Sequence, residues 1–184
     1  MKAPEIIKTE RLILRKPLND DAEAIFSRYS SDLEVTKYLG WPRHRIIEDT
    51  KSFLAFSDAE WERWPAGPYL IESLVEQRLL GSTGLAFESP SVAATGYVLA
   101  RDAWGFGYAT EALNAVVALA RDLGVNRLYA LCHPANVASV HVLGKCGFHN
   151  EGFTPSQHRF PNLDPDDPGE CLCFARHFEP AART

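Results

Sequence analysis

The stretch WGFGYATEA, residues 104–112, decides the fold and the function of this 184-residue chain. A strand-like run ends just before it, and a helical pattern starts inside it. Gly105 and Gly107 allow the backbone to approach a ligand closely and to adopt dihedral angles that other residues avoid. The first amides of a helix lack intrahelical partners and carry the positive end of the helix dipole. The stretch therefore predicts an anion site large enough for a pyrophosphate.

Two other ligand sites fit this stretch poorly. In a dinucleotide-binding G-x-G-x-x-G turn, Thr110 would stand at the third glycine, and Cys132 would replace the acidic residue that ends the next strand. A nucleotide-triphosphate loop requires Gly-Lys-Ser/Thr, which is absent. A plain helix-entry turn without a ligand also satisfies the local chemistry. The stretch alone leaves the anion site and the plain turn open.

The hydrophobic pattern on both sides of this turn predicts one α/β domain. Six apolar residues between 109 and 120 recur with helical spacing, and Gly124 suits the end of that helix. Residues 127–132 are apolar on both sides, which is typical of a buried central strand. Further strands are expected at 9–16, 69–75, 79–87, 95–100, from 147 onward and at 170–178; helices at 19–29, 33–39, 46–64 and 134–145; and a loop at 160–169.

This order of elements predicts a single mixed, mostly antiparallel, twisted sheet flanked by helices. A hairpin is expected at residues 76–78, between two of the strands. The strand–helix–strand unit between residues 95 and 132 is expected to be right-handed, with its two strands parallel.

Composition argues against several classes of function. Lys and Arg number 19 and Asp and Glu 24, so the formal charge is −5, whereas nucleic-acid binding requires a basic face. No apolar run reaches the length of about 20 residues that a membrane helix needs, and the first seven residues do not resemble a signal peptide. Cys132, Cys146, Cys171 and Cys173 match no zinc spacing. We expect a cytoplasmic protein with reduced cysteines, no metal and no nucleic-acid or membrane partner.

Three motifs, in order, resemble the GNAT family of N-acetyltransferases. The turn at 104–112 resembles the family's acetyl-coenzyme A pyrophosphate loop, and the run from Asn136 to Phe148 resembles its second signature. The opening TERLILR, residues 9–15, is similar to the branch that contains the ribosomal-protein alanine and serine N-terminal acetyltransferases. The resemblance implies one GNAT domain with the acyl-CoA N-acyltransferase fold over residues 8–178, with short tails at 1–7 and 179–184.

The resemblance also implies where acetyl-coenzyme A binds. Trp104 stands at the Arg/Gln position of the family's R/Q-x-x-G-x-G/A pattern, and the turn amides would hold the pyrophosphate. The strand before the turn would pair with the pantetheine amides. Asn136 matches a residue that contacts the pantetheine arm, and it also suits a helix N-cap. The implied cofactor-binding residues are Val98, Leu99, Ala100, Trp104, Gly105, Phe106, Gly107, Tyr108, Ala109, Thr110 and Asn136.

The resemblance implies direct acetyl transfer from the thioester to a neutral amine in a ternary complex. Many members carry a Tyr seven residues after the Asn, as the acid near the sulfur, but Leu143 stands there. Ser139 is the expected substitute hydrogen-bond donor, or else an ordinary helix-surface serine. Glu88 and His133 are the candidate bases, with a water-relayed base as the third option.

The remaining carboxylates offer no clear base. Many members of the family carry a carboxylate at the position of Ala94. The first-turn carboxylate Glu111 more simply complements the helix dipole.

The resemblance implies that the acceptor is a primary amine, either a peptide N-terminus or a small molecule. Trp41 is the candidate substrate-facing residue, and a homodimer is compatible with the resemblance. The rival hypothesis is a catalytically degenerate sensor or assembly module that binds acetyl-coenzyme A without turnover. The replacements at Leu143 and Ala94 motivate it.

Overall fold

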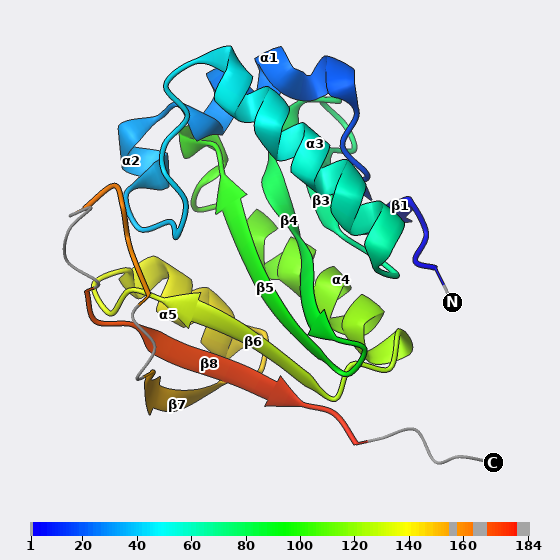
Figure 1. Cartoon of the computed structure of the whole chain (residues 1–184), viewed down its shortest axis with the longest axis vertical. Helices are drawn as coiled ribbons and strands as arrows, with labels where there is room; N and C mark the ends of the chain where they lie inside the picture. Colours follow the sequence, from blue (N-terminus) through cyan, green and yellow to red (C-terminus); the bar gives the residue numbers. More distant parts are fainter. Residues whose placement is uncertain (1, 155–157, 164–168, 180–184) are drawn as a thin grey trace.

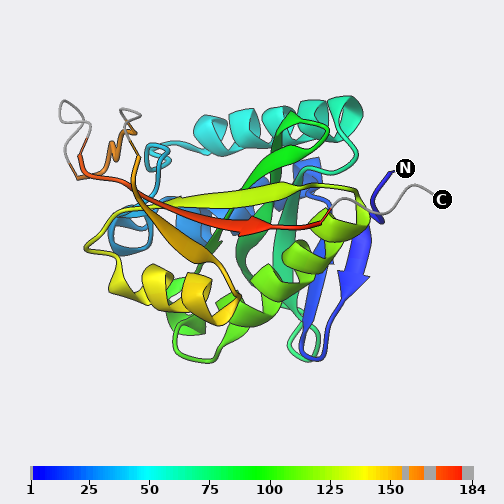
Figure 2. The same ribbon diagram turned by 90° about the horizontal axis from the view of Figure 1, so that it is seen from below.

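A central eight-stranded sheet organises the molecule, with the strand order β1-β2-β3-β4-β5-β6-β8-β7 (Figure 1). The computed structural model describes residues 2–154, 158–163 and 169–179. Helix α3 lies on one face of the sheet, and α4 and α5 lie on the other (Figure 2). Neighbouring strands are antiparallel except β5 and β6, which are parallel. The predicted mixed, mostly antiparallel sheet flanked by helices is confirmed.

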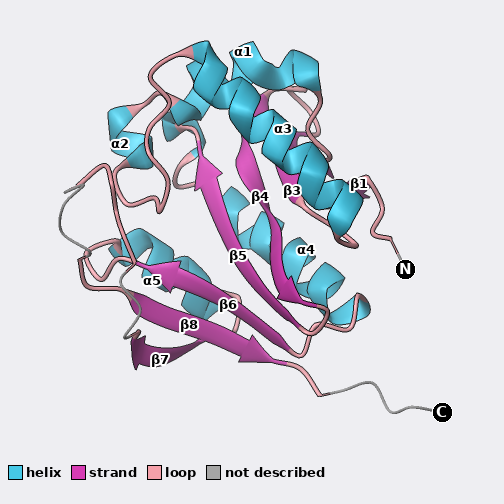
Figure 3. Ribbon diagram, in the orientation of Figure 1, coloured by secondary structure: helices cyan, strands magenta, loops and turns pink. Residues whose placement is uncertain are grey.

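Figure 3 distinguishes the strands from the helices. The strands are β1 (Ile6–Lys8), β2 (Leu12–Arg15), β3 (Pro68–Ser73), β4 (Leu79–Ser89), β5 (Val92–Leu99), β6 (Arg127–Cys132), β7 (His149–Phe153) and β8 (Leu172–His177). The α-helices are α1 (Ala22–Ile25), α2 (Leu33–Thr36), α3 (Ile47–Arg63), α4 (Tyr108–Asp122) and α5 (Val137–Lys145). Shorter helical turns are η1 (Asn19–Asp21), η2 (Phe26–Ser30) and η3 (Arg101–Ala103).

The first predicted strand, residues 9–16, is wrong in its extent. The structure has a hairpin there, in which β1 pairs antiparallel with β2. Thr9 makes the turn: its amide donates to the Leu12 carbonyl at 2.9 Å, and its hydroxyl accepts from the Leu12 amide at 3.1 Å. The sheet therefore begins at Ile6, two residues before the expected start of the domain. In the predicted loop at 160–169, residues 164–168 lie outside the described part of the chain.

Strands β5 and β6 pair over a short distance and then diverge. Their register joins Val92–Ala94 to Arg127–Tyr129 and goes no further. Beyond this point β5 continues to Leu99 beside β4, and β6 continues to Cys132 beside β8. Figure 1 shows the two arrows opening into a V. One edge of β5, from residue 95 to residue 99, therefore lacks a partner strand.

Gly81 fixes the free end of β5 against β4. It lies opposite Leu99 in the β4–β5 register. A Cβ atom at Gly81 would lie 1.9 Å from the Val98 carbonyl oxygen, well inside van der Waals contact. The absence of a side chain thus brings the two backbones close together and sets the position of the unpaired edge.

The N-terminal hairpin holds the turn that precedes α4. Glu111, in the first turn of α4, accepts hydrogen bonds from the Thr9 hydroxyl at 2.6 Å, the Arg11 amide at 2.8 Å and Arg11 Nε at 2.7 Å. Arg11 Nη1 also donates to the Phe106 carbonyl at 2.9 Å, and its guanidinium lies 4.8 Å from the centre of the Tyr108 ring. We call Thr9, Arg11 and Glu111 the clasp. It joins segments about 100 residues apart in the sequence.

The clasp changes the ionisation of Glu111. Burial alone would raise the pKa of this carboxyl group, but the hydrogen bonds from Thr9 and Arg11 outweigh it and lower the pKa. A group whose pKa is lower in the folded state stabilises the fold above its unfolded pKa. That contribution is lost as the pH falls through the folded value.

Replacing Glu111 by Gln should lower the free energy of unfolding at pH 7 by about 1–2 kcal/mol, because a charged acceptor of hydrogen bonds is lost. The difference from the wild type should shrink as the pH falls below about 4.3, the ordinary pKa of a glutamate. Denaturant unfolding between pH 3 and 7 measures both effects.

Glu48→Gln is the matched control. Glu48 also lies in the first turn of a helix, α3, but its carboxylate makes only an exposed pair with Lys51. We expect a change of about 0.5 kcal/mol or less. Equal losses in the two variants would show that the helix dipole, and not the clasp, explains the role of Glu111.

Candidate active site

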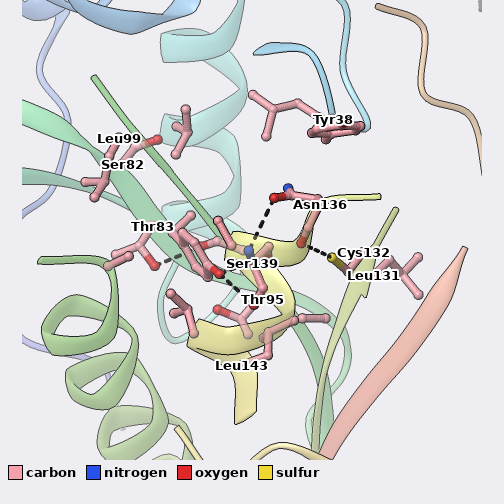
Figure 4. A pocket seen from close by; sticks show the side chains of 18 of the residues that line it. Tyr38, Ser82, Thr83, Thr95, Leu99, Leu131, Cys132, Asn136, Ser139 and Leu143 are labelled. Carbon is pink, nitrogen blue, oxygen red and sulfur yellow. Dashed lines mark hydrogen bonds between the residues drawn. The ribbon is translucent and has the colours of Figure 1, made fainter. Parts of the chain in front are cut away.

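A cavity of about 1110 Å³ opens where β5 and β6 diverge. Its walls come from β4, β5, the end of β6, the turn before α4, the first turns of α5 and the segment around α2. Figure 4 shows this cavity with Thr95, Ser139 and Leu143 on one side of it and Tyr38 on the other. A cavity of this size accommodates a large ligand together with part of a second molecule.

The turn before α4 forms one end of the cavity. Gly105 and Gly107 have φ angles of +82° and +80°, which favour glycine, and Gly107 is the N-cap of α4. The Trp104 indole N–H donates to the Leu99 carbonyl at 2.8 Å and so ties the turn to the end of β5. The expected turn residues that line the cavity are Trp104, Gly105, Gly107, Tyr108, Ala109 and Thr110.

One expected turn residue, Phe106, is not among those that line the cavity. Its side chain is exposed, and its ring stacks on Tyr108 with centroids 5.8 Å apart. Its carbonyl accepts from Arg11, as described above. A contribution of Phe106 to ligand binding would therefore come from its backbone amide.

The strand residues expected to bind the cofactor differ in what they offer. Val98 and Leu99 both line the cavity, but backbone groups of successive strand residues point to opposite edges, so of these two only Leu99 presents its amide at the edge of β5 that has no partner strand. Ala100 is buried and is not among the lining residues, and its amide already donates to the Leu80 carbonyl at 2.7 Å. Only the first two residues lie along the cavity wall.

Asn136 and Ser139 sit at the start of α5, facing the cavity (Figure 4). Asn136 is the N-cap of this helix, and its Oδ1 accepts from the Ser139 amide at 3.2 Å. The predicted capping role of Asn136 is confirmed. Leu143, one turn further on, is 1% exposed and supplies an apolar surface to the cavity.

Tyr97 is a polar cavity residue that the sequence analysis missed. It lies on β5, and its hydroxyl oxygen is 2.8 Å from Ser139 Oγ. The strand pattern at 95–100 indicated an element but not which side chains would face α5. The packing of α5 beside the open end of β5 brings the two hydroxyls together.

The two predicted bases lie outside the cavity lining. Glu88 is exposed near the end of β4, where it accepts a hydrogen bond from the Tyr129 hydroxyl. Burial, together with this carboxylate, raises the pKa of Tyr129 to about 12. His133 stacks on Tyr38 at 5.2 Å and meets the edge of Phe160 at 4.9 Å, so it lies behind two rings that do line the cavity.

Aromatic side chains and one imidazole form the other end of the cavity. Trp41, the predicted substrate-facing residue, lines it together with Tyr38, Phe160 and His158. Burial lowers the pKa of His158, so its imidazole is neutral near pH 7. Among the described residues that line the cavity, Glu34 carries the only carboxylate. No local pattern in the sequence indicates His158, because a segment far along the chain brings it here.

Within residues 2–154, 158–163 and 169–179, no cluster of three or more His, Cys, Asp or Glu side chains is arranged to hold a metal ion. None of the helices in these ranges is both long and apolar enough to span a membrane. Cys132, Cys146, Cys171 and Cys173 are free thiols.

Comparison with known proteins identifies the family. The acetyltransferase (GNAT) domain model matches residues 11–149. A Bacillus subtilis (strain 168) protein named "Uncharacterized N-acetyltransferase YoaA" is 33% identical over 165 residues, which is 88% of this chain and 92% of that protein. The structure of a GNAT-family acetyltransferase from Bacillus anthracis has a TM-score of 0.79 and 26% identity, covering 94% of this chain and 98% of that one.

A second solved structure is that of RimL, named as a ribosomal L7/L12 alpha-N-protein acetyltransferase in complex with coenzyme A. It has a TM-score of 0.83 at 23% identity, and the match covers 95% of this chain and 99% of RimL. At this level of identity the likeness shows the fold alone. Together with the match of the domain model over most of the chain, these findings show that the protein belongs to the GNAT acetyltransferase family.

Proposed function

We propose that this enzyme transfers the acetyl group of acetyl-coenzyme A to a primary amine by direct attack in a ternary complex. One observation carries the proposal. The unpaired edge of β5 and the amide-bearing turn before α4 open into the same cavity. An elongated ligand with amides at one end and a diphosphate at the other matches these two features.

The residues present fit such a ligand. Amides of residues 105–110, at the positive end of α4, suit a diphosphate. The free edge of β5, which includes the Leu99 amide, suits the pantetheine amides, which would bond to it as an added strand does. The Leu99 carbonyl already accepts from the Trp104 indole. Ala100 has neither backbone group free, because its amide donates to Leu80 and its carbonyl accepts from the Ala103 amide at 2.9 Å. Coenzyme A in the structure of RimL, which shares this fold, agrees with the assignment.

Bound acetyl-coenzyme A supplies the thioester whose acyl carbon accepts the amine. Ser139, at the start of α5, would donate a hydrogen bond to the sulfur as negative charge develops there. Its hydroxyl faces the cavity, whereas the buried Leu143 has no proton to offer.

Proton removal from the amine is assigned to His158. Its ring lines the aromatic end of the cavity, and its lowered pKa keeps it neutral and able to accept a proton. Near pH 7, neutralising the amine costs about 1 kcal/mol for an α-amino group and about 4–5 kcal/mol for a lysine. Glu88 and His133 are weaker candidates, because neither lines the cavity.

The acceptor would approach past Trp41 and Tyr38, with the Glu34 carboxylate at the same end of the cavity. Lys37 also lines the cavity, with its ammonium group 5.3 Å from the centre of the Tyr38 ring, so the aromatic rings and not the net charge favour an amine acceptor there. Two kinds of acceptor, a peptide N-terminus and a small-molecule amine, stay predictions. The same is true of the homodimer, the cytoplasmic location and the absence of a metal and of nucleic-acid partners.

Thiol release from acetyl-coenzyme A, measured against a panel of peptide N-termini, polyamines, aminoglycosides and amino acids, tests the proposed function. At least one amine class should accelerate release well above the rate without an acceptor. Tight cofactor binding without turnover on any amine would favour the rival hypothesis of a sensor or assembly module.

Replacing Gly107 by Val should abolish coenzyme A binding, because a branched side chain disfavours the positive φ angle and covers the turn amides. Isothermal titration calorimetry measures the affinity. Gly124→Val is the matched control, since Gly124 has a φ angle of +81° at the opposite end of α4. Retained affinity in Gly107→Val, or an equal loss in both variants, would contradict the assignment of the turn.

The role of His158 gives a separate prediction. His158→Gln should lower kcat by about 10²–10⁴-fold, the usual contribution of a general base, and leave the affinity for coenzyme A unchanged. His133→Gln is the control, with a ring behind the cavity wall. Unchanged turnover in His158→Gln would exclude His158 as the base.

A further inference from the structure

The hydroxyl groups of Tyr97 and Ser139 form an isolated pair across the diverging strands. Tyr97 lies on β5 beside the free edge, and Ser139 lies on α5, directly after β6. The two hydroxyl oxygens are 2.8 Å apart, and the Tyr97 hydroxyl also donates to the Ser139 carbonyl at the longer distance of 3.3 Å. Asn136 fixes the Ser139 backbone from the other side, because its Oδ1 accepts a hydrogen bond from the Ser139 amide at 3.2 Å. The backbone of Ser139 is thus held by Asn136, and its hydroxyl group lies against Tyr97.

Each of these two hydroxyl groups carries one hydrogen, so the direction of the bond between them determines whether Ser139 can donate to a ligand. If Ser139 donated to Tyr97, its only hydrogen would be used and none would remain for a ligand. If Tyr97 donates to Ser139 Oγ, the hydrogen of Ser139 is free. Burial raises the pKa of Tyr97, although the hydrogen bond with Ser139 opposes the rise, so the phenol keeps its proton near neutral pH and is able to donate.

Ser139 also acts on a neighbouring sulfur atom. Burial raises the pKa of Cys132, and a hydrogen bond with Ser139 opposes this rise. The hydroxyl of Ser139 therefore lies within reach of a sulfur atom as well as of Tyr97.

We propose that Tyr97 is a positioning residue, which donates to Ser139 Oγ and thereby directs the Ser139 hydrogen at the sulfur of coenzyme A. This inference rests on the proposed function. Tyr97 and Ser139 together would supply the hydrogen bond to sulfur that the apolar Leu143 lacks. Neither hydroxyl transfers its proton, since both are weaker acids than a thiol.

The pKa of the coenzyme A thiol in its complex with the protein tests the proposal. Thiolate forms with a rise in ultraviolet absorbance. The difference between the coenzyme A complex and the acetyl-coenzyme A complex removes the signal of the protein's own thiols and tyrosines. In the wild type the bound thiol should titrate below about 8.5, its ordinary range. Tyr97→Phe and Ser139→Ala should each raise this pKa by about 0.7, the equivalent of one lost hydrogen bond.

The double variant shows whether Tyr97 acts through Ser139. Tyr97→Phe combined with Ser139→Ala should give the same thiol pKa as Ser139→Ala alone. Tyr69→Phe is the matched control, because the Tyr69 hydroxyl donates to the Pro4 carbonyl at 2.6 Å and Tyr69 is not among the residues lining the cavity. The Tyr69→Phe variant loses a comparable hydrogen bond, but it should leave the pKa of the bound thiol unchanged.

Two results would overturn the inference while leaving the proposed function standing. One is a wild-type thiol pKa in Tyr97→Phe, which would make Tyr97 a purely structural residue. The other is full additivity in the double variant, which would mean that Tyr97 acts on the sulfur independently of Ser139. Failure of the wild type to bind coenzyme A would instead contradict the proposed function, and the inference with it.

Discussion

The site depends on the limited pairing of β5 with β6. Only three residue pairs join the two strands before they diverge. Each strand keeps its other neighbour, β4 or β8, for its whole length, so both edges stay rigid while the space between them opens. Backbone amides and carbonyls on a free strand edge require partners. A ligand with peptide-like amides meets that requirement, and the same opening gives the cavity room for an acceptor.

The cavity between β5 and β6 is formed by several elements, and a different contact positions each of them. The N-terminal hairpin holds the turn before α4 through the clasp, and Trp104 ties the same turn to the end of β5. Gly81 holds the end of β5 against β4. Asn136 caps α5 and fixes Ser139. The diphosphate end, the strand edge and the thioester end of the proposed ligand site are therefore each positioned by a different contact.

Local patterns in the sequence predicted those elements whose own residues specify their structure. β6 has the predicted bounds, because a short run with apolar residues on both sides has few alternative structures. The turn before α4 was predicted from its glycines, and α4 from one apolar face. The β1–β2 hairpin was missed, because Thr9 makes its turn without Gly or Pro. Tyr97 and His158 were missed because tertiary packing brings them to the cavity, and no spacing of residues in the local sequence indicates this. The tie between Glu111 and the TERLILR motif crosses about 100 residues, and no pattern within either segment reveals it.

The central claim is that backbone amides of residues 105–110 hold the diphosphate of coenzyme A. Amide hydrogen exchange of the wild-type protein, with coenzyme A and with pantetheine, tests it most directly. Coenzyme A should slow exchange both in this turn and along residues 95–99, whereas pantetheine, which lacks the diphosphate, should protect only the strand. Unchanged exchange in the turn at saturating coenzyme A would contradict the account.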